Sequence, residues 1–263
     1  MPDGGGWLNE VEELAPRLQA EGFVRLAGPA ARRWIGSPDE PAWRAFARSW
    51  DDLGPDLYMA DGGRYRRRRH AAFHVVGPSI IRKPHQPHYQ SRDFNRLNGG
   101  VERWFEPVAE AVAASRILRG VLRSCGALFS AADRPGAPAP WHVEVHQFRI
   151  EAGGDTIGKP TPEGFHRDGV DWVFVMLVDR QNVLEGVTEI GDPEGGELGH
   201  FTLIDAADSV LLDDRRVLHG VTPIRPADPS RPAWRDVLVA TYTASMPVGA
   251  QRVRRRASRR NRP

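Results

Sequence analysis

Two histidines and one aspartate have the types and spacing needed to hold a metal ion. His166 and Asp168 are two residues apart in Gly164-Phe-His-Arg-Asp-Gly169, shortly before the apolar run Trp172–Val178. That run does not alternate and is rich in β-branched and aromatic residues, which is typical of a strand buried on both faces. Side chains two apart on a strand share a face, so His166 and Asp168 can point at one place.

A third donor, His219, lies in Val217-Leu-His-Gly220, much later in the chain. Alone, a His-x-Asp pair is equally typical of a turn aspartate beside a solvated histidine. Here the pair is followed by a buried strand, several short strands and a later histidine, and this order favours a metal site. Two histidines and a carboxylate on one face of an octahedral ion leave three positions open, which is the arrangement of non-haem Fe(II) oxygenases.

Arg235 begins the strand-like run that ends at Tyr242. A guanidinium is a planar, permanently charged clamp for a carboxylate. Arg225 and Arg231 are nearer to the histidine in sequence, but both lie among prolines, where we expect a surface loop and solvated side chains. We therefore predict that Arg235 points into the interior beside the metal and binds an anionic ligand.

Several motifs occur together in an order that resembles one family, the bacterial Fe(II)/2-oxoglutarate dioxygenases typified by L-isoleucine hydroxylase. The downstream motifs are Pro160-Thr-Pro-Glu-Gly164, His166-Arg-Asp-Gly-Val-Asp171, Leu212-Asp-Asp214, His219-Gly-Val-Thr-Pro223 and Arg235-Asp-Val-Leu-Val239. The upstream motifs are Tyr58-Met59, Asp61-Gly-Gly-Arg-Tyr-Arg66, Asn98-Gly-Gly100 and Val143-Glu-Val-His-Gln-Phe-Arg149. The resemblance thus extends from about Tyr58 to Tyr242.

The resemblance implies an enzyme that uses Fe(II), 2-oxoglutarate and O₂. His166, Asp168 and His219 would hold the iron, and Arg235 would bind the distal carboxylate of 2-oxoglutarate. The expected reaction is hydroxylation of an sp³ carbon of a small substrate, most simply a free L-amino acid of specialised metabolism, with no catalytic residue beyond the metal ligands. Two alternatives stay open: an oxygenase that acts on nucleic acid or protein, and a non-catalytic jelly-roll binding module.

The segment His142–Arg149 suggests a rival metal site, because His142, Glu144 and His146 share one face of a strand. It is not a zinc-protease motif, which needs a glutamate directly after the first histidine, on a helix.

The opposite face of the same segment carries two valines, then Gln147 and Arg149. If the valines face the barrel core, Gln147 and Arg149 lie further along the inward face. Gln147 then becomes a candidate for contact with 2-oxoglutarate and Arg149 for contact with the substrate. Trp172, at the start of the buried strand, is a further candidate for the substrate.

Composition favours a β-rich fold. The 263 residues include 22 prolines and 27 glycines, which indicates many turns and short elements. We predict a mainly β fold with flanking helices, a double-stranded β-helix (jelly roll, cupin-like). A single domain would span 1–250, with a helical and irregular buttress in 1–135 and the jelly-roll core in 142–242. The arginine-rich tail, 251–263, should be disordered.

Within the buttress, apolar spacing predicts a helix from Trp7 that is stopped by Gly22, a second helix opened by Asp39, and a longest helix at about 101–125. The stretch 51–98 is expected to be irregular, and its run Arg64–His70 to form structural salt bridges in preference to binding substrate or nucleic acid.

The turn after the strand Val210–Leu212 contains Asp213 and Asp214. Turn chemistry is the favoured role of both, and the alternative is that one of them orients His219.

The charge and the cysteine content limit the kinds of partner and the cellular location that we expect. The tail carries seven arginines and no acid, so the rest of the chain has a net charge of −5 although the total is +2. We expect a small-molecule partner and neither a nucleic acid nor a membrane. The single cysteine, Cys125, and an N-terminus without the regions of a signal peptide favour a cytoplasmic protein.

Overall fold

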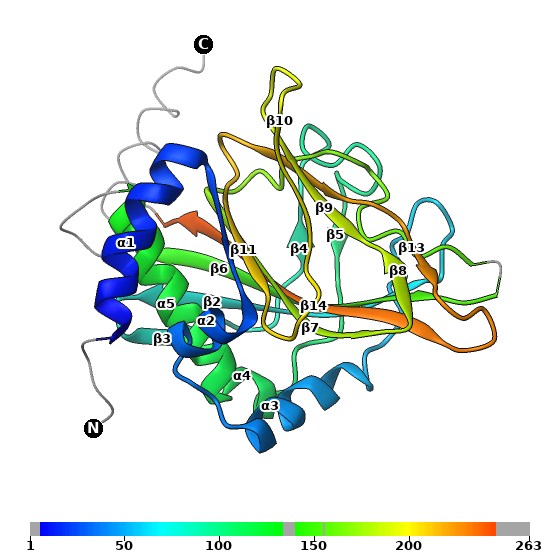
Figure 1. The fold of residues 1–263 in the computed structure, drawn as a ribbon, viewed down its shortest axis with the longest axis horizontal. Helices are drawn as coiled ribbons and strands as arrows, with labels where there is room; N and C mark the ends of the chain where they lie inside the picture. The colour runs from blue at the N-terminus through cyan, green and yellow to red at the C-terminus, as the bar shows by residue number, and fades with distance from the viewer. Residues whose placement is uncertain (1–5, 134–139, 155, 246–263) are drawn as a thin grey trace, which may run out of the picture.

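A seven-stranded antiparallel sheet contains the long strands of the protein (Figure 1). The computed structural model describes residues 6–133, 140–154 and 156–245. In sheet order the strands are β1 (Phe23–Leu26), β11 (Ser209–Asp213), β7 (Trp172–Gln181), β14 (Ala233–Ala244), β6 (Trp141–Ala152), β2 (Arg66–Val76) and β3 (Ser79–Arg82). The longest ones, β14, β6, β2 and β7, lie at its centre.

Three smaller sheets complete the β structure. They are β10 (Glu197–Thr202), β9 (Val187–Gly191) and β12 (Leu218–Val221); β13 (Ile224–Pro226) with β8 (Val183–Glu185); and β4 (His88–Tyr89) with β5 (Glu102–Arg103). The consecutive strands β9 and β10 pair antiparallel and form a hairpin. The large sheet and the β10-β9-β12 sheet face each other as the two layers of a jelly roll, which confirms the predicted fold class.

Helices cover the other face of the large sheet (Figure 1). They are α1 (Gly6–Glu21), α2 (Gly28–Trp34), α3 (Glu40–Ala47) with the 3₁₀ turn η1 (Arg48–Trp50), α4 (Glu110–Ala113) and α5 (Arg116–Asp133). As predicted, Asp39 opens a helix, because its carboxylate accepts the N–H of Ala42 at 2.8 Å. Among the described residues, no helix combines the length and the apolar character that crossing a lipid bilayer requires.

The prediction of a helix at 101–125 was wrong about its position. The longest helix, α5, begins at Arg116, and residues 102–103 form β5 instead. Pro107 lacks the N–H that a continuous helix would use. The Ser115 hydroxyl then accepts the N–H of Leu118 at 3.2 Å, which caps a new helix start.

The prediction that 51–98 is irregular was wrong for β2, and the region assigned to the buttress supplies three strands of the large sheet. The arginines of β2 make the expected salt bridges: Arg66 with Asp56 at 2.7 Å and Arg67 with Glu151 at 2.8 Å. These pairs let a highly charged sequence form a central strand. The tail 251–263 lies outside the described residues.

Both faces of the large sheet are buried. Val143 and Val145 on β6 and Leu238 on β14 pack with the helices. Val237 and Val239, on the other face of β14, pack toward the smaller sheet. The interior between the two β layers therefore lies on the side of β14 that carries Val237 and Val239.

Candidate active site

Backbone hydrogen bonds bring the two candidate histidine ligands together. His166 lies in the segment before β7, and His219 lies in β12. The two residues form an isolated antiparallel bridge, in which each N–H donates to the other's carbonyl at 3.0 Å. The positions of both imidazoles are thus set by main-chain contacts.

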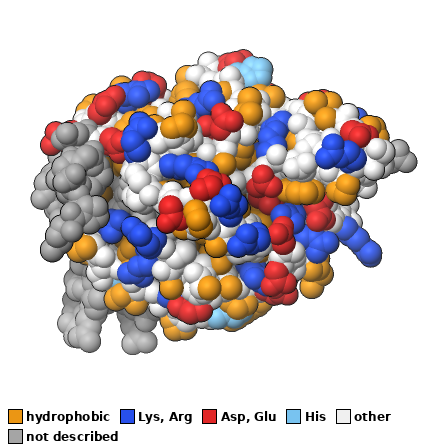
Figure 2. Space-filling model, turned by 60° about the horizontal axis from the view of Figure 1, so that its bottom comes forward, with side chains coloured by type: hydrophobic (Ala, Val, Ile, Leu, Met, Phe, Trp, Pro, Cys, Tyr) orange, Lys and Arg blue, Asp and Glu red, His pale blue; other side chains and the backbone are white. Residues whose placement is uncertain are grey.

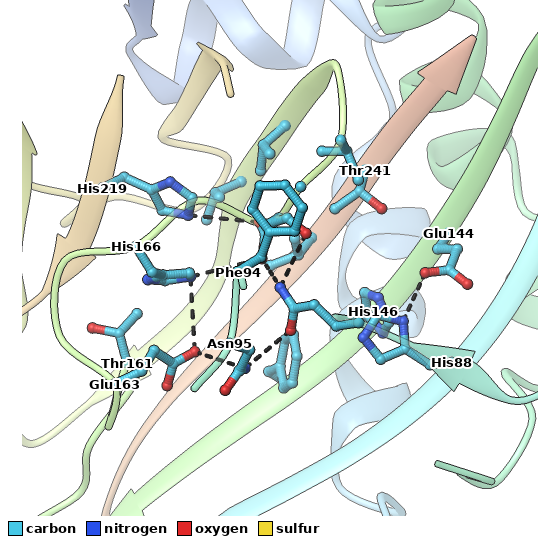
Figure 3. A pocket seen from close by; sticks show the side chains of 18 of the residues that line it. His88, Phe94, Asn95, Glu144, His146, Thr161, Glu163, His166, His219 and Thr241 are labelled. Carbon is cyan, nitrogen blue, oxygen red and sulfur yellow. Dashed lines mark hydrogen bonds and ion pairs between the residues drawn. The ribbon is translucent and has the colours of Figure 1, made fainter. Parts of the chain in front are cut away.

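The three side chains line one cavity, and Figure 3 shows the imidazoles of His166 and His219 close together in it. Nε2 of His166 lies 3.7 Å from Oδ1 of Asp168, and Nε2 of His219 lies 3.7 Å from Oδ2. The Nδ1–H of His166 donates to the Gly164 carbonyl at 2.9 Å, so Nε2 is the nitrogen that faces the site. One ligand atom from each residue lies within 4.8 Å of the others, so the set fits one metal ion.

Electrostatics within the triad favour a bound cation. Burial lowers the pKa of His166, but hydrogen bonding to Asp168 and its charge outweigh burial and raise the pKa to about 9. Burial and the neighbouring His166 lower the pKa of His219 to about 4. The pKa of Asp168 lies below its usual range, because the two histidines outweigh the effect of burial. The aspartate therefore stays anionic between two imidazoles.

Asp214 holds the ligand segment in place. Its carboxylate accepts the backbone N–H groups of Asp168, Gly169 and Val170 at 2.9, 2.8 and 3.0 Å. Asp213 instead accepts from the backbone and side chain of Arg215, as a turn residue does. The favoured turn role therefore fits Asp213, whereas Asp214 orients the segment of Asp168 and, within the described part of the chain, forms no hydrogen bond with His219.

We expect Asp214→Asn to weaken Fe(II) binding about 10- to 100-fold, the usual cost of losing a residue that supports a metal ligand. An amide has one acceptor oxygen and cannot accept the same three N–H groups. Anaerobic Fe(II) titration measures the effect, with Asp213→Asn as the matched control. Equal iron affinity in both variants would contradict this role.

A cavity of about 390 Å³ extends from the triad between the β layers. Valines from β7 and β14 line it: Val173, Val175, Val237 and Val239. The segment between β4 and β5 covers it, and Gln90 from this segment donates to the carbonyl and to Oδ1 of Asp168 at 3.1 and 3.3 Å. A side chain at Gly169 would overlap the ring of Phe94, which shows how closely the covering segment packs on the ligand loop.

Arg235 lies in this cavity on the face of Val237, as predicted. Only 2% of its surface is exposed, and neither Nε nor Nη2 has a hydrogen-bond partner among the described residues. Burial and the nearby charge of Arg180 lower its pKa to about 10. Arg225 and Arg231 are exposed, as expected. A buried guanidinium with unpaired N–H groups fits the carboxylate of 2-oxoglutarate.

Three predicted contacts lie elsewhere. Gln147 donates to the Ser49 hydroxyl at 2.9 Å, and Arg149 pairs with Asp236 at 2.7 Å. Neither residue lines the cavity, because the valine face of β6 packs against the helices and not into the barrel. The prediction that Gln147 and Arg149 point into the barrel was therefore wrong. Trp172 is also outside the cavity lining and stacks on Phe129 in the helix-facing core, with ring centroids 5.1 Å apart.

The lining residues that the sequence analysis missed include Gln90, Phe94, Asn95, Arg103 and Glu163. The first three lie in the covering segment, whose irregular sequence has no periodicity. Glu163 lies in the motif Pro160–Gly164, so the resemblance indicated the segment but not the role of this side chain.

A profile described as 2OG-Fe dioxygenase matches residues 47–241. The chain is 22% identical over 236 residues to L-isoleucine-4-hydroxylase of Bacillus thuringiensis, covering 89% of this chain and 95% of that protein. It is 24% identical over 195 residues to 3(1)-hydroxy-L-isoleucine 4-dioxygenase of Pantoea ananatis, covering 74% and 78%.

Solved structures agree with the fold. A bsmA homologue from Methylobium petroleophilum has a TM-score of 0.81 and 38% identity, covering 89% of this chain and 93% of that one. IDO from Bacillus thuringiensis has a TM-score of 0.74 at 16% identity, covering 90% and 100%. With the profile match over most of its length, this chain belongs to the 2OG-Fe dioxygenases, oxidoreductases that use Fe(II), 2-oxoglutarate and O₂.

Proposed function

We propose that this dioxygenase hydroxylates an sp³ carbon of a free aliphatic L-amino acid, with L-isoleucine as the first substrate to test. The two curated relatives are named for isoleucine and hydroxyisoleucine. His166, Asp168 and His219 hold Fe(II) in this proposal, and Arg235 binds the distal carboxylate of 2-oxoglutarate.

The observation that carries the proposal is a pair of oppositely charged, incompletely bonded side chains in the cavity. Arg103 is 2% exposed, and its Nε has no partner among the described residues. Oε2 of Glu163 is likewise buried and unpartnered there. Both residues line the cavity. A zwitterion would supply a carboxylate to Arg103 and an ammonium group to Glu163.

The rest of the cavity suits an aliphatic side chain. Val173 and Val175 from β7 and Val237 and Val239 from β14 form an apolar wall. When bound, iron, 2-oxoglutarate and O₂ would supply the oxidising chemistry, in which one oxygen atom of O₂ goes to succinate, the other goes to the hydroxylated product, and CO₂ is released. The protein's part is to hold the donors, orient the co-substrate through Arg235 and exclude water with this wall.

The face of the molecule shown in Figure 2 gives no support to a nucleic-acid substrate. On the face shown in Figure 2, acidic and basic side chains are interspersed and do not gather into a basic stripe. A small cavity between two sheets also fits a small molecule better than a polymer.

We expect the enzyme to convert L-isoleucine to a product one oxygen atom heavier, with one succinate formed per product. N-acetyl-L-isoleucine and L-isoleucine methyl ester each lack one of the two charges. Each should have kcat/KM at least about tenfold lower, because a hydrogen bond to a charged group contributes about 1.5–3 kcal/mol. Mass spectrometry and succinate assays measure this. Equal turnover of the three compounds would reject recognition of the two charges of an amino acid, and no turnover of any of them would reject L-isoleucine as the substrate.

A further inference from the structure

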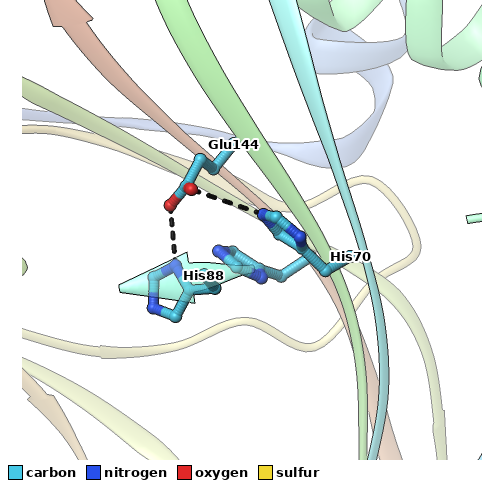
Figure 4. Close-up of side chains that lie close together, drawn as sticks. His70, His88 and Glu144 are labelled. Carbon is cyan, nitrogen blue, oxygen red and sulfur yellow. Dashed lines mark hydrogen bonds and ion pairs between the residues drawn. The ribbon is translucent and has the colours of Figure 1, made fainter. Parts of the chain in front are cut away.

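A second cluster of possible metal ligands lies outside the triad: His70, His88, Glu144 and His146. His70 is on β2, His88 on β4, and the other two are on β6 (Figure 4). The register of β2 against β6 places His70 opposite His146. The face of β6 that carried the rival metal motif thus meets two histidines from elsewhere in the chain.

The donor atoms of this cluster lie close enough to share one ion. One ligand atom from each residue lies within 4.8 Å of the others. Nδ1 of His88 is 2.7 Å from Oε2 of Glu144, and Nε2 of His70 is 3.5 Å from Oε1. The ring centroids of His70 and His88 are 5.7 Å apart. Two imidazoles from different elements therefore flank both oxygens of one carboxylate.

The burial of His70 and its lack of hydrogen bonds indicate that this cluster binds a ligand. Its side chain is 0% exposed, and neither ring nitrogen forms a hydrogen bond among the described residues, since Nε2 has only the 3.5 Å contact with Glu144 and Nδ1 has none. A buried polar group without a partner costs free energy, so such groups in native proteins usually have a protein, water or metal partner. An ion between His70 and Glu144 would satisfy one of the two nitrogens.

A hydrogen bond from Arg68 excludes one of the four residues, His146, as a ligand of the ion. Its Nη2 donates to Nδ1 of His146 at 2.8 Å, and its guanidinium lies over the rings of Phe105 and Phe148. A guanidinium has no acceptor, so Nδ1 of His146 must accept and Nε2 must carry the proton. His146 is therefore occupied, and His70, His88 and Glu144 remain as ligands.

We propose that His70, His88 and Glu144 bind a zinc ion, at a site separate from the proposed iron triad but on the wall of the same cavity, which His88 and Glu144 line. Two imidazoles and one carboxylate suit Zn²⁺, which accepts nitrogen and oxygen donors. The ion would tie β4 to β2 and β6. Because β4 begins the segment that covers the cavity and places Gln90 on Asp168, zinc would fix that segment over the iron site.

The test measures metal content in the untagged full-length chain. A His166→Ala/Asp168→Ala variant, which lacks two iron ligands, is dialysed against excess Zn²⁺ and then against buffer. We expect it to retain one zinc per chain by mass spectrometry. Adding His70→Gln or Glu144→Gln should remove that zinc, whereas His74→Gln, a change on the same strand outside the cluster, should not.

Thermal unfolding provides a second readout, since an ion that binds only the folded state raises Tm. Zinc should raise the Tm of the His166→Ala/Asp168→Ala variant and of its His74→Gln derivative, and not that of the His70→Gln derivative. If His70→Gln does not fold, His88→Gln replaces it, because the His88 side chain is partly exposed, at 13%. No zinc in the starting variant, or zinc retained after the ligand changes, would overturn the proposal. Neither readout depends on the substrate or on turnover.

Discussion

His219→Ala is expected to abolish succinate formation and to lower Fe(II) affinity more than about a hundredfold. A lost ligand should exceed the 10- to 100-fold cost of losing a supporting residue. His219 is held in β12 by backbone bonds, and its Nε2 faces Asp168 at 3.7 Å. Removing the imidazole leaves two of the three donors, and iron then lacks the set that keeps three positions open for 2-oxoglutarate and O₂. Iron content after anaerobic loading and succinate release measure the two effects.

His200→Ala is the matched control, because this histidine on β10 has a 59% exposed side chain and forms no part of either cluster. It should leave both quantities unchanged. Far-UV circular dichroism should be the same for both variants, since the backbone bridge to His166 does not involve the imidazole. Near-normal turnover in His219→Ala would show that the triad is wrongly assigned.

Arg235→Ala should raise the KM for 2-oxoglutarate at least about a hundredfold, with iron still bound. The guanidinium is buried, and two of its nitrogens have no partner within the described part of the chain, so a carboxylate there would form a desolvated pair. Breaking such a pair by removing one partner costs roughly 3–5 kcal/mol, which corresponds to on the order of a hundred- to several-thousandfold in affinity. Steady-state kinetics at varied 2-oxoglutarate concentration measures the change.

Two other arginines provide controls. Arg225 and Arg231 are exposed, so Arg225→Ala and Arg231→Ala should change this KM less than about threefold, as surface substitutions usually change free energies by up to about 0.5 kcal/mol. If Arg225→Ala gave the large effect and Arg235→Ala the small one, 2-oxoglutarate would be anchored elsewhere.

The sequence predicted correctly which face of β14 points into the barrel, but it did not do so for β6. On β14, Arg235 shares a side with Val237 and Val239, and all three line the cavity. On β6 the same logic failed, because a jelly-roll sheet with a helical layer has two buried faces. Its valines pack under the helices, and its polar face, with Glu144 and His146, turns toward the cavity. Hydrophobic alternation identifies two faces but not which layer each one meets.

Only two of the four residues of the second histidine cluster could be recognised as neighbours from the sequence. Glu144 and His146 showed a shared strand face, but His70 was in an arginine run and His88 in a segment without periodicity. Their approach depends on the pairing of β2 with β6, which no local pattern encodes. The proposed iron triad could be recognised in the sequence for the opposite reason, since its motifs are ordered along the chain and two of its members are two residues apart.

The bridge between His166 and His219 has a consequence for engineering. The donors are held by main-chain bonds and by the Asp214 carboxylate, while the covering segment 88–103 comes from a separate part of the chain. The bridge and Asp214 thus preorganise the donors mainly from outside the covering segment, which reaches them through Gln90 on Asp168 and Phe94 on Gly169. Libraries in the covering segment that keep Gln90 and Phe94 unchanged could alter which carbon is presented to the oxidant, while the bridge and Asp214 keep the donors in place.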